Sequence, residues 1–199
     1  MTKNSEQTKQ DILDAVGRML ARQGFQGIGV NALAREAGVD KVLIYRYFGG
    51  LDKLLEEYAK QGGFWPSIGT LLGRPAHSFE TLSEMTEAIL KGHLRELRQR
   101  PVTQEIMRWE LHERNELTAE LARFRETQGL EIMDLMPQTD KTDDEIDLAA
   151  MGAIIHAGLT YLILRAKTAD VYLGVDLTDD DGWQRVENAI SSLLTVLKK

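Results

Sequence analysis

Apolar residues recur along the chain every three to four positions, which is the spacing of amphipathic helices. The first stripe, within residues 8–23, places Ile12, Val16, Met19 and Leu20 on one face, and Gly24 follows it. Further stripes predict eight more helices, at residues 30–37, 40–48, 51–61, 78–100, 103–113, 116–136, 142–167 and 183–197. No segment alternates as a strand does. The pattern therefore predicts an all-α fold of about nine helices.

The segment "DKVLIYRYF" at residues 40–48 does not fit a helix with a single buried face. At 100° per residue, Ile44 and Phe48 share an inner face, whereas Val42 and Arg46 lie on the opposite side. The preceding Ala37-Gly38-Val39 is a short turn between two helices. This is the helix-turn-helix arrangement, whose second helix lies in the major groove of DNA.

The outward side chains of this helix suit a DNA duplex. Val42 and Leu43 can contact thymine methyl groups, and Lys41 can reach a base edge or a phosphate. Tyr45 and Tyr47 can reach phosphates with their hydroxyls. Alternatives stay open at this point: the tyrosines as core aromatics, Val42 packed on a neighbouring helix, and Lys41 or Arg46 as solvated charges.

A longer stretch, "GIGVNALAREAGVDKVLIYRYFGGLDKLLEEY", resembles the DNA-binding module of the TetR/AcrR family of transcriptional regulators. The resemblance covers residues 12–58. It depends on the following residues: Leu33-Ala34, Ala37-Gly38-Val39, Tyr45, Tyr47-Phe48 and Leu54-Leu55. It implies a dimer formed by the last two long helices, a ligand cavity in the C-terminal domain and repression released by a ligand.

The resemblance also implies which residues contact DNA. These are Val30, Asn31, Lys41, Val42, Leu43, Tyr45 and Tyr47. One position departs from the family, because Leu51 stands where a lysine is frequent. Lys53, two places on, is expected to face elsewhere on the helix, which leaves one ionic contact in doubt.

Charge separates the N-terminal part of the chain from the rest. The formal net charge is −7, yet residues 1–60 carry nine Lys/Arg against eight Asp/Glu, and residues 61–199 carry fifteen against twenty-three. Only the N-terminal part can approach a polyanion without strong repulsion. The chain has no cysteine, its first residues are polar, and its most apolar segment, 148–164, falls short of a membrane span. We expect a cytoplasmic protein.

Candidate catalytic and metal chemistry is sparse. The four histidines (His77, His93, His112 and His156) show no i, i+4 or HExxH spacing. Residues 179–181 lack the spacing of an EF-hand and suit helix capping. No nucleophile–base or carboxylate constellation stands out. We expect no enzyme activity, no metal and no cofactor.

The C-terminal helices provide candidates for an effector pocket and a dimer interface. Large adaptable side chains that suit an apolar or aromatic effector, or equally a core, are Met107, Trp109, Met133, Met136 and Tyr161. The helix at residues 148–164 is apolar around most of its circumference and rich in small residues. With the last helix it predicts a dimer contact through Gly152, His156, Leu159, Ile190 and Leu194.

These patterns predict a two-domain homodimeric regulator, most simply a repressor that binds a palindromic operator and is released by a small molecule. Residues 1–50 are the expected DNA-binding domain and residues 51–199 the effector-binding and dimerisation domain, with 51–61 as a connecting helix. The alternatives are a helical adaptor protein or an enzyme that uses the C-terminal cavity.

Overall fold

The computed structural model describes residues 3–61, 63–114, 116–137 and 147–197. Within these ranges, ten α-helices, two 3-10 turns and one small hairpin follow each other along the chain. The α-helices are α1 (Lys3–Gln23), α2 (Val30–Ala37), α3 (Lys41–Phe48), α4 (Leu51–Lys60), α5 (Ile68–Leu72), α6 (Leu82–Arg98), α7 (Pro101–His112), α8 (Glu116–Leu135), α9 (Leu148–Arg165) and α10 (Asp180–Leu197). The 3-10 turns are Phe25–Gly27 and Ala76–Ser78. The all-α fold is thereby confirmed.

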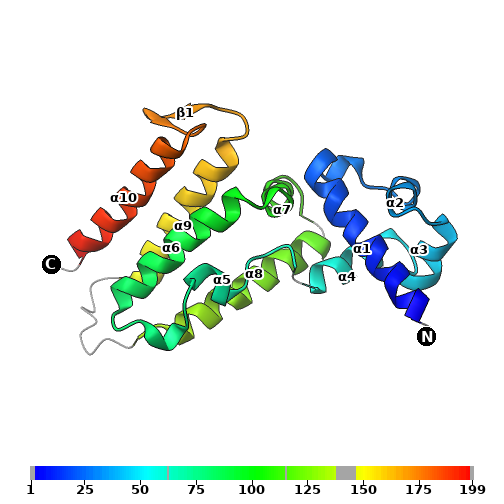
Figure 1. Cartoon of the computed structure of the whole chain (residues 1–199), viewed down its shortest axis with the longest axis horizontal. Coiled ribbons are helices and arrows are strands. Elements are labelled where there is room, and N and C mark those ends of the chain that lie inside the picture. The colour runs from blue at the N-terminus through cyan, green and yellow to red at the C-terminus, as the bar shows by residue number, and fades with distance from the viewer. Residues whose placement is uncertain (1–2, 62, 115, 138–146, 198–199) are drawn as a thin grey trace. The chain divides into compact units, whose positions relative to one another are not determined.

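The helices form two compact units that interleave along the sequence. One unit comprises Met1–Trp65 and Arg100–Gly129, and the other comprises Pro66–Gln99 and Leu130–Lys199. The chain therefore enters the second unit at Pro66, returns at Arg100 and leaves the first unit again within α8. Figure 1 shows α1 to α4 close together, with α7 beside α1.

The first unit has a core built from the inner stripe of α1. Ile12, Val16, Met19 and Leu20 are all buried, as the 3.6-residue period predicts. The helices that follow each add apolar side chains to the same core, chiefly Leu33, Ile44 and Leu54. Burial of a side chain of this size stabilises a fold by about 1.5–3 kcal/mol. The core therefore fixes the positions of α2 and α3 within the first unit.

Contacts from α7 and α8 complete the first unit. The ring of Trp109 in α7 stacks on Phe25, and Phe124 in α8 lies against Phe64 with ring centroids 5.6 Å apart. Arg125 in α8 pairs with Glu110 in α7. These contacts join the helix-turn-helix region to two helices that are far from it in sequence.

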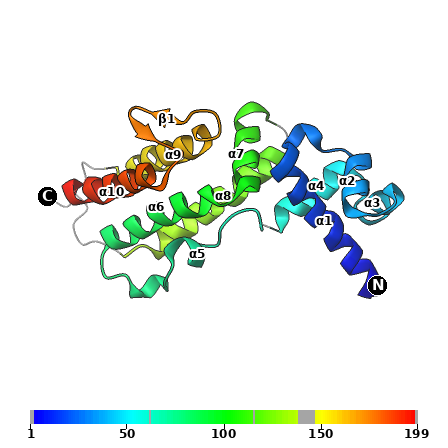
Figure 2. The same ribbon diagram turned by 45° about the horizontal axis from the view of Figure 1, so that its top comes forward.

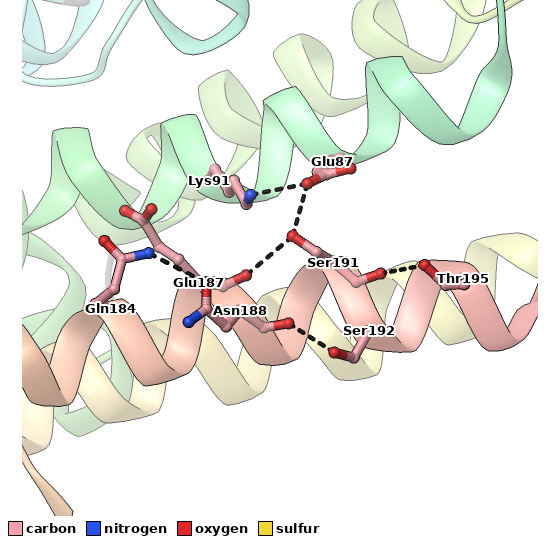
Figure 3. Close-up of polar contacts among 8 residues, drawn as sticks. All are labelled: Glu87, Lys91, Gln184, Glu187, Asn188, Ser191, Ser192 and Thr195. Atoms are coloured by element: carbon pink, nitrogen blue, oxygen red, sulfur yellow. Dashed lines mark hydrogen bonds and ion pairs between the residues drawn. The ribbon is translucent and has the colours of Figure 1, made fainter.

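The second unit is centred on α6. Both α9 and α10 run alongside α6 (Figures 1 and 2), and α5 packs on it closely enough that a Cβ at Gly92 would lie 1.9 Å from the Leu71 carbonyl oxygen. Polar contacts join α6 to α10. Ser191 donates a hydrogen bond of 2.7 Å to Glu87, whose carboxylate also pairs with Lys91 (Figure 3).

A short antiparallel hairpin connects α9 to α10. Its strands are β1 (Val171–Tyr172) and β2 (Val175–Asp176), with Tyr172 paired to Val175. Arg185 donates a hydrogen bond to the Gly174 carbonyl, and Trp183 Nε1 donates one to the Leu177 carbonyl. Leu173 sits at the turn with a φ of 48° and is 88% exposed.

Two expectations from the sequence are wrong in detail. The chain has the hairpin at residues 171–176, where no strand is expected, because strands of two residues are too short to show alternation. The helix expected at 78–100 is preceded by a separate 3-10 turn and starts only at Leu82, capped by the Thr81 hydroxyl. The start of the helix expected at 142–167 lies outside the described residues, and α9 is described from Leu148. No helix in the described ranges has the length and apolarity that crossing a membrane requires.

Candidate nucleic-acid interface

A tight turn sets the direction of α3 relative to α2. Gly38 ends α2 in the left-handed region with a φ of 68°, where glycine carries no steric penalty. The Val39 amide then donates a hydrogen bond of 2.9 Å to the Ala34 carbonyl. Asp40 caps the next helix, since its carboxylate accepts a hydrogen bond from the Val42 amide. The helix-turn-helix geometry is therefore encoded by residues 37–40.

The side chains of α3 divide between core and solvent as the helical wheel predicts. Ile44 is fully buried, whereas Val42 is 61% exposed and Tyr45 is 54% exposed. Leu43 and Tyr47 are half-buried on the flanks. The helix therefore presents an apolar and phenolic surface outward, and none of these four flank or outer residues is enclosed by the subunit.

The other DNA contacts expected from the sequence lie at helix starts. Lys41 is exposed in the first turn of α3, Asn31 is exposed in the first turn of α2, and Val30 beside it is half-buried. Helices α2 and α3 pack against each other. The structure thus gathers the seven predicted residues on two adjoining helices.

Ion pairs remove some basic groups of this unit from the candidate surface. Arg18 and Arg22 of α1 both bind Glu36, and their hydrogen bonds hold the pKa of that carboxyl below its ordinary value. Lys41 and Arg46 of α3 form no ion pair with any described residue. Lys41 and Arg46 are therefore basic groups of α3 that can neutralise phosphates without breaking an ion pair.

Arg46 is a further candidate for the DNA interface, for which the helical wheel did not decide between a DNA contact and a solvated charge. It is exposed and lies one turn after Val42, on the same outward side of α3. The i, i+4 relation to an exposed valine is the signal in the sequence, but it does not distinguish a phosphate contact from a solvated charge.

The five predicted pocket residues are divided between the two units. Met107 is buried in the first unit, where Trp109 stacks on Phe25. In the second unit, Met136 packs against a cluster that contains Leu72 and Phe79. Met133 and Tyr161 are about half exposed, and the Tyr161 ring meets the edge of Tyr172.

The residues chosen for a dimer contact require a correction. Leu159, Ile190 and Leu194 are buried within the subunit itself, so they are not available to a second copy. Gly152 and His156 are half-buried. A different face of α9 is exposed, and its residues follow the i, i+3, i+4, i+7 spacing of a helix: Ile154, Ala157, Gly158 and Tyr161.

Two smaller expectations concern side chains of the second unit. His156 lies against the buried His93, with ring centroids 4.0 Å apart, and His93 shares a hydrogen bond with Thr160. The His156 ring is thus packed against another ring of the same subunit. Asp179 accepts a hydrogen bond from the Gly182 amide at the start of α10, which confirms a capping role for the aspartate run.

The fold and this surface define a helix-turn-helix protein, in which the buried apolar side chains of the first unit hold the recognition helix in place. The family model for bacterial regulatory proteins of the tetR family matches residues 12–58. That segment begins within α1, ends within α4 and contains all seven residues that were predicted to contact DNA.

Solved structures share the fold of the whole chain. A protein described as a TetR-family transcriptional regulator from Rhodococcus sp. is 21% identical, with a TM-score of 0.68 over 94% of this chain and 99% of that one. The fatty acid degradation regulator FadR from Bacillus halodurans is 20% identical, with a TM-score of 0.67 over 94% of each chain. FadR from Bacillus subtilis, in complex with stearoyl-CoA, is 18% identical, with a TM-score of 0.63 over 93% and 96%.

No curated protein sequence matches the chain. The match of residues 12–58 and the shared fold nevertheless confirm the resemblance seen in the sequence. Residues 12–58 therefore match the N-terminal module of tetR-family regulatory proteins, and the chain as a whole shares the fold of solved TetR-family regulators.

Proposed function

We propose that this protein is a repressor that binds a palindromic operator as a homodimer and leaves it when a small molecule binds. Residues 1–50 are the proposed DNA-binding domain, and residues 51–199 are proposed to bind the effector and the second subunit. Within the second domain, residues 51–61 form the helix that connects it to the first. The observation that carries the proposal is the outward surface of α3, where Val42 and Tyr45 are exposed beside an unpaired Lys41.

This surface suits a major groove better than solvent or a protein partner. Exposed valine and leucine side chains match thymine methyl groups, while tyrosine hydroxyls and lysine match phosphates. Two such helices in a dimer read half-sites about 34–36 Å apart, or a multiple of that distance, on the same face of a duplex.

Selection of duplexes from a random pool tests the proposal. The unmodified protein is expected to enrich an inverted repeat whose half-sites are about one helical turn apart. Enrichment of no preferred sequence at moderate salt contradicts the proposal. The same assay separates the adaptor alternative, since Lys41→Ala weakens DNA binding in the proposed role and has no effect on DNA in an adaptor.

A search for the effector follows from mass action. A ligand that binds only the folded state raises the melting temperature, so a screen of apolar and aromatic metabolites identifies candidates. Acyl-CoA thioesters belong in that screen, because FadR from Bacillus subtilis shares the fold and was solved with stearoyl-CoA. A true effector also lowers operator affinity, with a coupling of about 1–3 kcal/mol.

A further inference from the structure

An open hollow of about 360 Å³ lies beside the recognition helix in the first unit. It is bordered by the start of α1, the last turn of α3 and one side of α4. Tyr47 and Phe48 line its α3 edge, and Lys53 and Lys60 line it from α4. The hollow therefore begins where the proposed DNA surface of α3 ends.

Lys53 lies at the α3 edge of this hollow, which the sequence did not suggest. Its aliphatic stem lies over the turn between the helices, because a Cβ at Gly49 would be 3.5 Å from the Lys53 Cδ. The side chain is exposed and forms no ion pair with any described residue. Lys53 was expected to face a different side of α4 from Leu51, and the structure adds that its stem reaches the turn between α3 and α4.

The rest of the hollow is electrically balanced. Its lysines are matched by glutamates, with Glu56 and Glu57 on α4 and a Lys9–Glu6 pair 3.8 Å apart on α1. It is therefore not a general anion site. Lys60 lies seven residues after Lys53, about 10 Å further along the same face of α4 and away from α3.

We infer that Lys53 is a further DNA-binding residue, which neutralises a backbone phosphate beside the groove that α3 occupies. The inference rests on the proposed DNA-binding function. Leu51, at the start of α4, is half-buried and carries no charge. The unpaired Lys53 at this edge of the hollow, which Tyr47 also lines, then supplies the charge that position 51 lacks.

The dependence of DNA affinity on salt tests this role directly, because each neutralised phosphate makes the slope of log K against log salt concentration more negative by about 0.9. The probe is the duplex that the unmodified protein selects from a random pool. Lys53→Gln is expected to make this slope less negative by about 0.9 for each subunit that makes the contact, and Lys53→Arg to leave the slope unchanged. Lys60→Gln is the matched control, and its slope is expected to equal that of the unmodified protein.

The possible outcomes separate this inference from the proposed function. Normal duplex selection with an unchanged slope for Lys53→Gln overturns the inference alone. An equal loss of slope for Lys60→Gln also overturns it, because the effect is then one of net charge. If the unmodified protein binds no duplex, the result contradicts both the role of Lys53 and the proposed DNA-binding function. Since Lys53 is exposed and unpaired, the variants are expected to melt as the unmodified protein does.

Discussion

Adjacent residues of α3 have opposite environments. Ile44 is fully buried in the core of the first unit, and Tyr45, the next residue, is 54% exposed. The buried side chain contributes to holding the helix, whereas the exposed ring is free to contact a ligand. A pair of alanine variants at these two positions therefore separates folding from binding.

Tyr45→Ala is expected to leave the free energy of unfolding nearly unchanged and to weaken operator binding by tenfold or more, since a hydrogen bond to a charged group contributes about 1.5–3 kcal/mol. Ile44→Ala is expected to lower the free energy of unfolding by about 2–5 kcal/mol. Denaturant unfolding and fluorescence anisotropy measure the two effects. Equal DNA affinity for Tyr45→Ala and the unmodified protein would remove this residue from the interface.

Tyr58 predicts a change of stability at alkaline pH. Burial, together with the negative charge of Asp14, raises the pKa of Tyr58 from 10.0 to about 12. Because the folded state holds the neutral hydroxyl more firmly than the unfolded chain does, this contribution is complete below pH 10 and is lost as the pH rises toward 12.

Denaturant unfolding between pH 9 and 12 measures that loss, with the window set by the shifted pKa. In Tyr58→Phe the decline of stability with pH is expected to be less steep, because the phenylalanine does not titrate. A decline of the same steepness in both proteins would show that Tyr58 ionises in the folded state as it does in the unfolded one.

At the scale of single elements, the recognition helix depends on its first cap. The Asp40 carboxylate accepts the Val42 amide at 2.9 Å, and no other side chain caps the start of α3 in the described residues. Asp40→Ala is therefore expected to lower the free energy of unfolding by about 1 kcal/mol, whereas Asp40→Ser, which keeps a capping oxygen, is expected to lower it less. Chemical denaturation distinguishes them, and equal losses would argue against a capping role.

The sequence predicted the helix-turn-helix closely because local signals determine it. The limits of α2, the cap at Asp40 and the stop at Gly49 all follow from residue types within a few positions. The short α5 was not predicted, because five residues after Pro66 are too few to show a period. The hairpin at residues 171–176 was missed for the same reason.

The buried face of α9 could not be predicted, for a different reason. Apolar residues surround most of its circumference, so the pattern does not distinguish the side that meets α6 from the side that meets solvent. Leu159 was assigned to a dimer contact on this basis and is in fact internal. The position of Lys53 over Gly49 likewise depends on the turn between two helices, which a wheel of α4 alone does not describe.

At the scale of the whole molecule, the exposed stripe of α9 predicts how the proposed dimer forms. Ile154 is 72% exposed and lies in line with Ala157, Gly158 and Tyr161. Small residues between larger apolar ones allow two helices to approach closely. A second copy that packs on this stripe removes apolar surface from water, which stabilises association by about 25 cal/mol for each Å² that is buried.

Ile154→Asp is expected to convert the dimer to a monomer, because it places a charge in the contact. Leu111→Asp is the matched control, since Leu111 is also an exposed apolar residue but lies on α7. Sedimentation velocity measures the mass of each variant. A dimer that persists in Ile154→Asp, or a monomer in both variants, would place the contact elsewhere.

The central claim is that the outward surface of α3 lies in a groove of duplex DNA. The most direct test is photo-cross-linking with a benzophenone amino acid placed at Val42 and, in a second protein, at the exposed Leu111. On irradiation with the selected duplex, the account predicts a covalent DNA adduct from position 42 and none from position 111. No adduct from position 42, under conditions where the duplex is bound, would contradict it.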